Sequence, residues 1–283
     1  MSKICALGIM QGRLLPKYSG RYQAHPVGYW QDEFPLAKEI GLQSIEFIAD
    51  ANDWEQNPLT SSPGIKQLRE ISAKHNVAIY SICADSFMET PLHKDDASSQ
   101  IARERLTTLI KASPQIGCQC IVIPCVDQSS IKTNEEKQKL ANVLNDFVPL
   151  CQQNDIMLAL ESDWNPKEFG NFMERVDTSV IKVNYDIGNS ASLGYDPKEE
   201  FVAYGSLIWD VHIKDRILGG GSVFLGSGNA NFREVFGLLE KMNYDGLFVM
   251  QAFRDDQGIN IFKQQKEFIT QYLKPWTTLG LKA

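Results

Sequence analysis

Four segments in the second half of the chain each end with a side chain that can bind a cation. "MLALES" carries Glu161, "KVNYD" ends in Asp186, "DVHIK" carries His212 and "FVMQ" ends in Gln251. Two carboxylates and an imidazole form a mixed oxygen and nitrogen set that suits Mn²⁺ or Zn²⁺, with Co²⁺ and Mg²⁺ as further candidates. The amide oxygen of Gln251 adds a neutral fourth ligand. We therefore predict one divalent metal ion bound by these four side chains.

Each of these residues also has an ordinary structural interpretation. Glu161 or Asp186 could cap the helix that follows it, and His212 could be a buried histidine with its hydrogen bonds satisfied. Their occurrence at the ends of four successive apolar segments favours a shared site. Glu161 is then the predicted catalytic base, since a positioned carboxylate can move a proton. Lys214 lies on the same strand face as His212 and is the second catalytic candidate, with an ion pair to a nearby carboxylate as its alternative.

The segments that carry these residues alternate with segments of helical spacing along the whole chain. The expected strands are 4–10, 44–48, 77–83, 120–124, 156–161, 181–186, 208–214 and 247–251. The expected helices are about 28–40, 63–75, 98–116, 134–153, 166–176, 197–204, 231–242 and 259–273. Pro63 and Pro197 are predicted in the first turns of two helices, after Ser62 and Asp196 as N-caps, and Gly117 at the end of another.

Eight strand–helix units in 283 residues fit an α/β fold of the (β/α)₈ TIM-barrel type. An open doubly wound sheet is the alternative, but no G-x-G-x-x-G motif follows the first strand. We predict a single barrel domain over residues 1–283. In such a barrel the C-terminal ends of the strands meet at one mouth, so four neighbouring ends can converge on one ion.

Composition limits the partners. The formal net charge is −7, from 28 Lys and Arg against 35 Asp and Glu, and the basic residues are scattered. This argues against broad binding to nucleic acid or to anionic membranes, and no stretch approaches the length of an apolar membrane span. The six cysteines lie in or near apolar runs and read as buried free thiols of a cytoplasmic protein. A zinc site on Cys118, Cys120 and Cys125 is the alternative, although that spacing matches no usual pattern.

Further polar residues are expected around the mouth. Arginines follow the first, seventh and eighth strands, where they could hold a phosphate or hydroxyl groups. The glycine-rich loop from Asp215 to Ala230 could cradle a phosphate with its backbone amides, or close as a lid, or be a flexible loop without a ligand. The predicted substrate-binding residues are Arg13, Glu46, Asn189, Asp215, Arg216 and Arg254.

Several of these segments together resemble the sugar phosphate isomerase/epimerase family, with its xylose-isomerase-like barrel. The similar segments are "GIMQGRLLP", "LES", "YDIGNSASLGYDP", "VHIKDR" and "LGSGNANFREVF", which span nearly the whole chain. The branch that they resemble includes ketopentose-phosphate 3-epimerases and hexulose-6-phosphate isomerases. The resemblance implies a small sugar or sugar phosphate as substrate, and a metal held by Glu161, Asp186, His212 and a fourth residue. That fourth residue is glutamate in the epimerases and Gln251 here; their "GEG" is Gly226-Ser227-Gly228 here.

Gln251 affects which reaction the sequence predicts. The related epimerases use two glutamates as acid and base on opposite faces of the substrate, and glutamine cannot take a proton at neutral pH. A 1,2-isomerisation through an enediol needs one base, so Glu161 would suffice, unless Glu46, Asp215 or another group supplies the second proton. The sequence thus favours an isomerase over an epimerase.

Other functions remain open. A non-catalytic sugar-binding barrel and a metal-dependent dehydratase or keto-acid isomerase are the alternatives. An apurinic-site endonuclease of this barrel type is disfavoured by four histidines and a net charge of −7. A homodimer is a further possibility.

Overall fold

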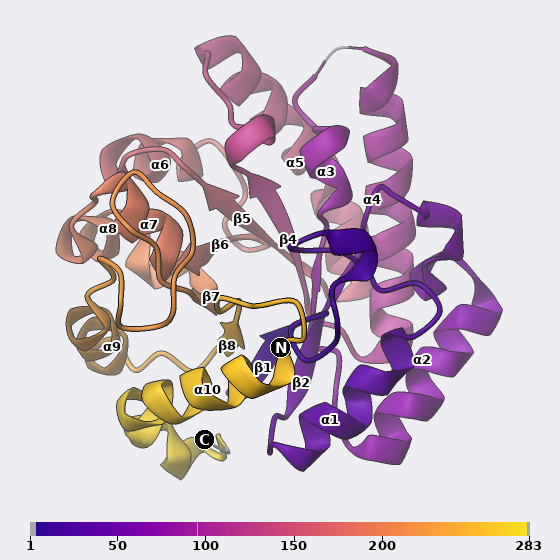
Figure 1. Cartoon of the computed structure of the whole chain (residues 1–283). Helices are drawn as coiled ribbons and strands as arrows, with labels where there is room; N and C mark the ends of the chain where they lie inside the picture. The colour runs from indigo at the N-terminus through magenta and orange to yellow at the C-terminus, as the bar shows by residue number, and fades with distance from the viewer. Residues whose placement is uncertain (1–3, 95, 282–283) are drawn as a thin grey trace.

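Eight parallel strands form a closed barrel in the order β1 to β8, with β8 paired to β1, in the computed structural model of the chain (Figure 1). The structure describes residues 4–94 and 96–281. The strands are β1 (Ala6–Met10), β2 (Ser44–Ile48), β3 (Ser81–Cys83), β4 (Cys120–Cys125), β5 (Met157–Ser162), β6 (Ile181–Asp186), β7 (Ile208–Ile213) and β8 (Leu247–Met250). This confirms the predicted (β/α)₈ fold.

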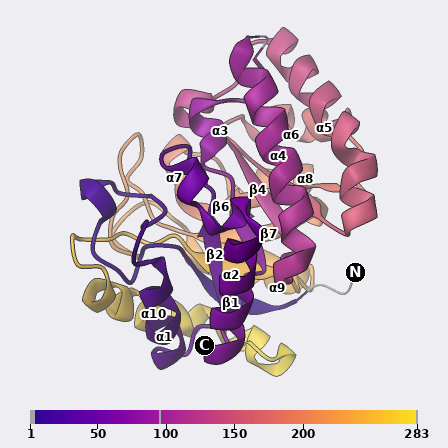
Figure 2. The same cartoon turned by 90° about the vertical axis from the view of Figure 1, so that its right-hand side faces the viewer.

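The helices surround the barrel (Figures 1 and 2). They are α1 (Glu33–Glu39), α2 (Ser62–His75), α3 (Ser86–Glu89), α4 (Ala97–Ile116), α5 (Asn134–Asn154), α6 (Pro166–Met173), α7 (Ile187–Leu193), α8 (Pro197–Tyr204), α9 (Phe232–Lys241) and α10 (Ile259–Leu273). Eight of them correspond to the predicted segments. The sequence reading missed α3 and α7, which are short helices directly after β3 and β6. Both begin at the mouth of the barrel, so they help to shape it.

Local signals in the sequence explain several helix ends. The Asp196 side chain caps α8 by accepting a hydrogen bond from the Lys198 amide, as predicted. The expected cap of α2 was wrong by one residue, because Ser61 accepts the hydrogen bond from Gly64 and Ser62 is already helical. Gly117 ends α4 with φ +78°, a left-handed conformation that glycine adopts without strain.

The apolar side chains form two layers, as expected for strands covered on both faces. A large core lies between the strands and the helices. Inside the barrel are two small clusters, one around Met10 and Val249 and the other around Val122 and Ala159. Polar groups, including Glu46, Asp210 and His212, are also buried within the strands. All six cysteines are free thiols. Cys5 is half-buried and the other five are buried, as the sequence predicted.

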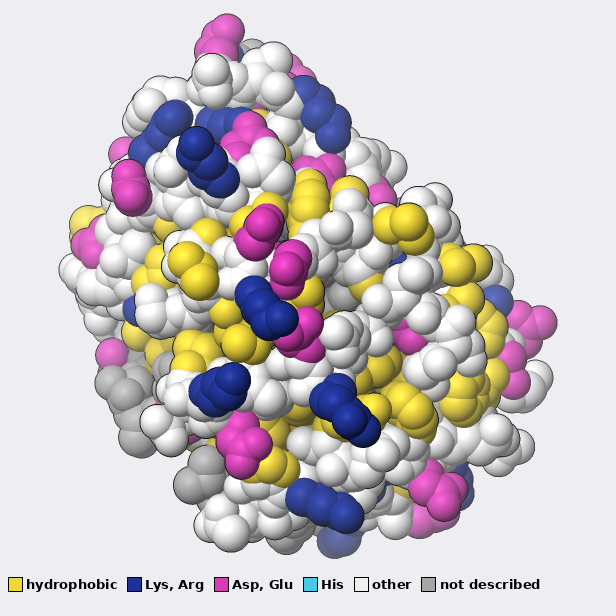
Figure 3. Space-filling model, turned by 90° about the vertical axis from the view of Figure 1, so that its left-hand side faces the viewer, with side chains coloured by type: hydrophobic (Ala, Val, Ile, Leu, Met, Phe, Trp, Pro, Cys, Tyr) yellow, Lys and Arg dark blue, Asp and Glu magenta, His cyan; other side chains and the backbone are white. Residues whose placement is uncertain are grey.

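On the face that α8 shares with its neighbours, both signs of charge alternate, with hydrophobic side chains between them (Figure 3). This face therefore lacks the continuous basic surface that nucleic acids need. Among the described residues, no helix combines the length and the apolar character of a membrane span.

Candidate active site

A cavity of about 440 Å³ opens where the C-terminal ends of the strands meet. Among the residues that line it are Glu161, Asn189, Lys214 and Gln251, all of them predicted for the site. A larger open groove of about 840 Å³ lies between α6 and α8, but none of the predicted site residues contributes to it. The chemistry of the side chains, and not the size of the hollow, therefore identifies the cavity at the strand ends as the candidate site.

Three of the four predicted metal ligands lie together, and one of them, Glu161, lines this cavity. Glu161, Asp186 and His212 are buried, and their ligand atoms all lie within 4.8 Å of one another. The parallel register places Asp186 directly opposite His212 on the neighbouring strand. His212 Nδ1 is buried and has no hydrogen-bond partner. Two carboxylates and a histidine with an unpartnered buried nitrogen form a donor set that a divalent cation uses, so these residues fit the predicted ion.

Gln251 takes a different position from the other three. Its Oε1 atom accepts a hydrogen bond from Lys214 Nζ at 3.0 Å, and its Nε2 donates to Gln23 Oε1 at 3.1 Å. Lys214 also donates to Asp186 Oδ2 at 3.2 Å, the ion pair that the sequence left as an alternative. The ammonium group of Lys214 thus lies between Gln251 and Asp186 and binds both side chains.

The carboxyl group of Glu161 is suited to proton transfer. Burial, followed by the neighbouring Asp186 carboxylate, raises the pKa of Glu161 to about 7, although His212 and Lys214 work in the opposite direction. Its Oε1 atom accepts a short hydrogen bond from Asn189 Nδ2, which fixes its orientation. A base with a pKa near the working pH is available for both accepting and returning a proton.

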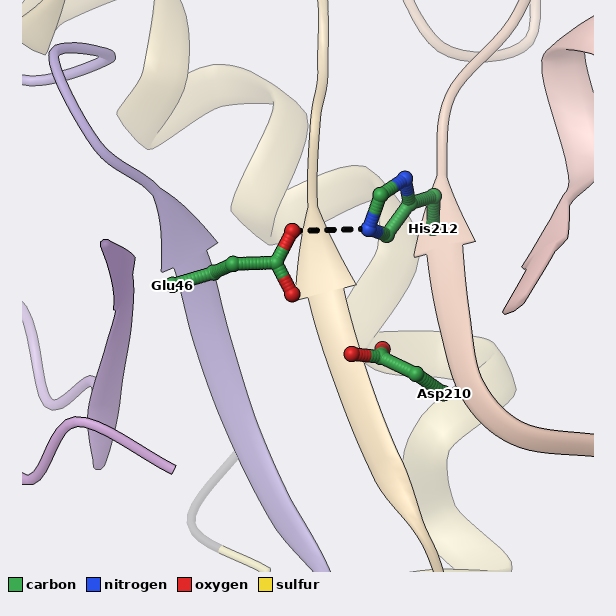
Figure 4. Close-up of side chains that lie close together, drawn as sticks. All are labelled: Glu46, Asp210 and His212. Atoms are coloured by element: carbon green, nitrogen blue, oxygen red, sulfur yellow. Dashed lines mark hydrogen bonds and ion pairs between the residues drawn. The ribbon is translucent and has the colours of Figure 1, made fainter. Parts of the chain in front are cut away.

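Glu46 does not lie at the mouth, which corrects the expectation that it binds substrate or supplies a proton there. Its side chain is fully buried inside the barrel, and its Oε1 atom lies 2.9 Å from His212 Nε2 (Figure 4). Burial lowers the pKa of His212, but Glu46 and Asp210 more than offset this and raise it to about 10. Because metals bind neutral imidazole, a cation at His212 would displace a proton.

Asp215 and Arg254 also differ from the expectation, since neither is among the residues that line the cavity. The Asp215 carboxylate is buried and accepts hydrogen bonds from the backbone amides of Gly226, Gly228 and Ala230 at 2.9 to 3.0 Å. These glycine amides, predicted to cradle a phosphate, are therefore already satisfied within the loop. The guanidinium of Arg254 donates to the carbonyl oxygens of Leu15 and Asp255.

The other two predicted arginines do line the cavity. Arg216 donates through Nη1 to Asn189 Oδ1 at 2.8 Å and through Nε to the Gly220 carbonyl at 2.9 Å. Arg13 is buried and donates to the carbonyl oxygens of Ala252 and Tyr22. Hydrogen bonds within the protein thus hold both arginine side chains in place at the wall of the cavity.

Sequence reasoning missed several residues of the opposite wall. Asp85 follows β3 and lines the cavity, and its carboxylate accepts two hydrogen bonds of 3.0 Å from Gln23 Nε2. Burial raises the pKa of Asp85, while the hydrogen bonds from Gln23 and Cys83 lower it. Arg21 and Asp50 form a bidentate pair with contacts of 2.6 and 3.1 Å. The sequence offered one sign that Asp85 belongs to the site, namely its position just after a strand. Glu161 was predicted from a similar position, at the end of its strand.

Comparisons with known proteins agree with the barrel fold. A family model described as "Xylose isomerase-like TIM barrel" matches residues 34–272. A protein of Escherichia coli strain K12 named "Putative L-ribulose-5-phosphate 3-epimerase SgbU" is 25% identical over 246 residues, which cover 80% of this chain and 84% of that protein. An inosose dehydratase of Clostridium tetani is 24% identical over 160 residues, covering 48% of this chain and 54% of that protein.

Solved structures extend the similarity of fold. The crystal structure of IOLI protein with a binding zinc atom superposes with a TM-score of 0.75 at 15% sequence identity, and the match covers 95% of this chain and 98% of that one. At that level of identity the match concerns the fold alone.

Proposed function

The chain belongs to the xylose isomerase-like TIM barrel family, and on that premise we propose that it is a metal-dependent isomerase or epimerase of a small sugar or sugar phosphate. The observation that carries the proposal is the convergence of Asp186 and His212 on Glu161, which lines the cavity, with Nδ1 of the histidine unpartnered. Mn²⁺ or Zn²⁺ suits this donor set. The similarity to the putative L-ribulose-5-phosphate 3-epimerase supports the same class of protein.

In the proposed reaction, each of these residues has a separate task. A bound divalent cation would polarise the substrate carbonyl and stabilise charge on its oxygen. Glu161 takes a proton from the carbon next to the carbonyl, which leaves the sugar as an enediol(ate), and then returns the proton to carbon. Asn189 orients the carboxylate of Glu161 through its hydrogen bond. Lys214 and Arg216 supply positive charge and hydrogen-bond donors to the substrate hydroxyl groups.

The face on which the proton returns decides between the two reactions. One base suffices for a 1,2-isomerisation, whereas inversion of a stereocentre requires a second proton donor on the opposite face. Gln251 cannot supply it, and Glu46 and Asp215 are buried away from the cavity lining. Two further carboxyl groups with a raised pKa line the cavity, Asp85 and Glu89. Asp85 is the more buried of the two. The arrangement favours isomerisation by Glu161, with Asp85 as the donor that epimerisation would require.

The position of deuterium in the product tests this proposal. The Mn²⁺-loaded or Zn²⁺-loaded protein is incubated in D₂O with ketopentoses and ketohexoses, each free and phosphorylated, and the products are followed by NMR. We expect deuterium at C1 or C2 for an isomerase and at C3 for an epimerase. Loss of water from inosose without isomerisation of any sugar would favour the dehydratase, an alternative supported by the Clostridium relative. Absence of exchange and turnover with every substrate would contradict the proposed reaction.

A further inference from the structure

We infer that Glu46 is the positioning residue of the metal site: it holds His212 from across the barrel so that Nε2 carries the proton and Nδ1 faces the cation. This inference rests on the proposed metal site and assigns a task to a buried carboxylate that the mechanism does not otherwise use. Figure 4 shows the two side chains pointing toward each other from β2 and β7. The second ring nitrogen, Nδ1, has no hydrogen-bond partner.

The contact crosses the interior of the barrel. In the strand order, β2 and β7 are separated by β8 and β1, so they are not hydrogen-bonded neighbours. The side chains nevertheless meet at 2.9 Å between Glu46 Oε1 and His212 Nε2, and both are fully buried. A hydrogen bond to an ionised carboxylate away from water is among the stronger kinds, so it can fix the plane of the ring.

Glu46 is itself held in place. Ser81, on the neighbouring strand β3, donates from Oγ to Glu46 Oε2 at 2.6 Å. His212 thus contacts Oε1 of Glu46 and Ser81 donates to Oε2, and the Asp210 carboxyl group also interacts with Glu46. Glu46 is thus a fixed hydrogen-bond acceptor for Nε2 of His212. In metal sites, a carboxylate that does not touch the metal commonly accepts the N–H of a metal-binding imidazole in this way.

The protonation of the ring follows from this acceptor. A neutral imidazole has one N–H and one nitrogen with a free lone pair, and the hydrogen bond that one nitrogen makes decides which is which. When a cation displaces one of the two ring protons and Glu46 accepts the other from Nε2, the lone pair belongs to Nδ1, the atom without a partner. Without Glu46 the ring can turn or change tautomer, and a fraction of the molecules presents the wrong atom to the cation.

A second cation among Glu46, Asp210 and His212 is the competing interpretation. The ligand atoms of these residues also lie within 4.8 Å of one another, and both carboxylate oxygens of Asp210 lack a hydrogen-bond partner. The direct contact between Glu46 and His212 favours positioning, because it already uses the two atoms that would bind such an ion. The number of ions bound per chain distinguishes the two interpretations.

Two measurements on Glu46→Ala and Glu46→Gln test the inference. The first is the Kd for Co²⁺ by titration calorimetry, with the number of ions per chain. We expect the Kd to rise roughly 10- to 100-fold in Glu46→Ala, with partial rescue in Glu46→Gln, whose amide oxygen can still accept from Nε2. The second is the ¹⁵N NMR spectrum of the imidazole in the Zn²⁺-loaded protein, where the metal-bound ring is neutral and the spectrum reports which nitrogen carries the proton. We expect the Nε2–H form in the wild type and a mixture in Glu46→Ala.

Glu33→Gln is the matched control. Glu33 is also a fully buried glutamate, but it accepts hydrogen bonds from the amides of Gly12 and Leu14 and has no contact with His212. We expect its Kd for Co²⁺ and its imidazole spectrum to match the wild type.

The outcomes separate this inference from the proposed function. Wild-type affinity in both Glu46 variants, or an unchanged tautomer in Glu46→Ala, would overturn the positioning role. Binding of two ions by the wild type and one by Glu46→Ala would overturn it as well, because Glu46 would then be a ligand. Absence of any Co²⁺ binding by the wild type would instead remove the metal site on which the proposed function rests. If Glu46→Ala does not fold, Glu46→Gln with wild-type affinity and a changed tautomer would also contradict the inference.

Discussion

Replacing Glu161 with glutamine is expected to lower kcat by about 10³-fold or more, because the amide cannot take a proton from the substrate. The substitution keeps the shape of the side chain and an oxygen that can accept the hydrogen bond from Asn189. The fold should therefore be retained, and the loss should appear in kcat more than in KM. The measurement is steady-state turnover of the substrate identified by NMR, together with exchange of deuterium into that substrate.

A buried glutamate outside the cavity provides the control for this variant. Glu200 accepts hydrogen bonds from Tyr185, Ser190 and Tyr204 and does not line the mouth of the barrel. Glu200→Gln should leave turnover unchanged while removing a charge of the same kind from the interior. Undiminished turnover in Glu161→Gln would remove Glu161 from the chemical step.

Replacing Asp215 with alanine is expected to destabilise the protein by about 3–5 kcal/mol, since three backbone amides would lose a buried charged acceptor. For a chain of this size the midpoint of thermal unfolding should fall by roughly 10 °C. The loop that these amides belong to also carries Arg216, Gly221 and Ser222 into the lining of the cavity. KM for the substrate should therefore rise, as measured beside a thermal unfolding curve.

Asp255→Ala is the matched comparison for the loop. The Asp255 carboxylate also accepts hydrogen bonds from two backbone amides, of Gln257 and Gly258, but the residue is exposed to solvent. Water can replace that acceptor, so its loss should lower the unfolding free energy by about 1 kcal/mol or less. Equal losses in the two variants would show that Asp215 does not organise the loop as described.

The sequence predicts this architecture well because its signals are local. Each strand is a short, mostly apolar run, polar residues lie at the C-terminal ends of β5 and β6, and the parallel barrel brings the strand ends to one mouth. The positions of Glu161 and Asp186 follow from this pattern alone. The predicted strand 77–83 was too long, since regular pairing covers only Ser81–Cys83 and Ala78 contributes a single bridge to Ser44.

What the sequence could not predict depends on contacts between distant residues. Glu46 and His212 are separated by 166 positions, and nothing in the pattern near either residue indicates that they meet inside the barrel. Asp215 was read as a mouth residue because it follows a strand, but its side chain turns back to accept from amides 11 to 15 residues further along. Loops of this kind determine which way a side chain points, and strand periodicity carries no information about them.

The position of a bound ion is the most direct test of the site. Crystals of the protein grown with Mn²⁺ should give one anomalous scattering peak per chain, within bonding distance of Glu161, Asp186 and Nδ1 of His212. Calorimetry should give one ion per chain, and binding should be lost in Asp186→Ala. A peak elsewhere in the molecule, or no bound ion at millimolar Mn²⁺ or Zn²⁺, would contradict the convergence of these three side chains on a shared cation.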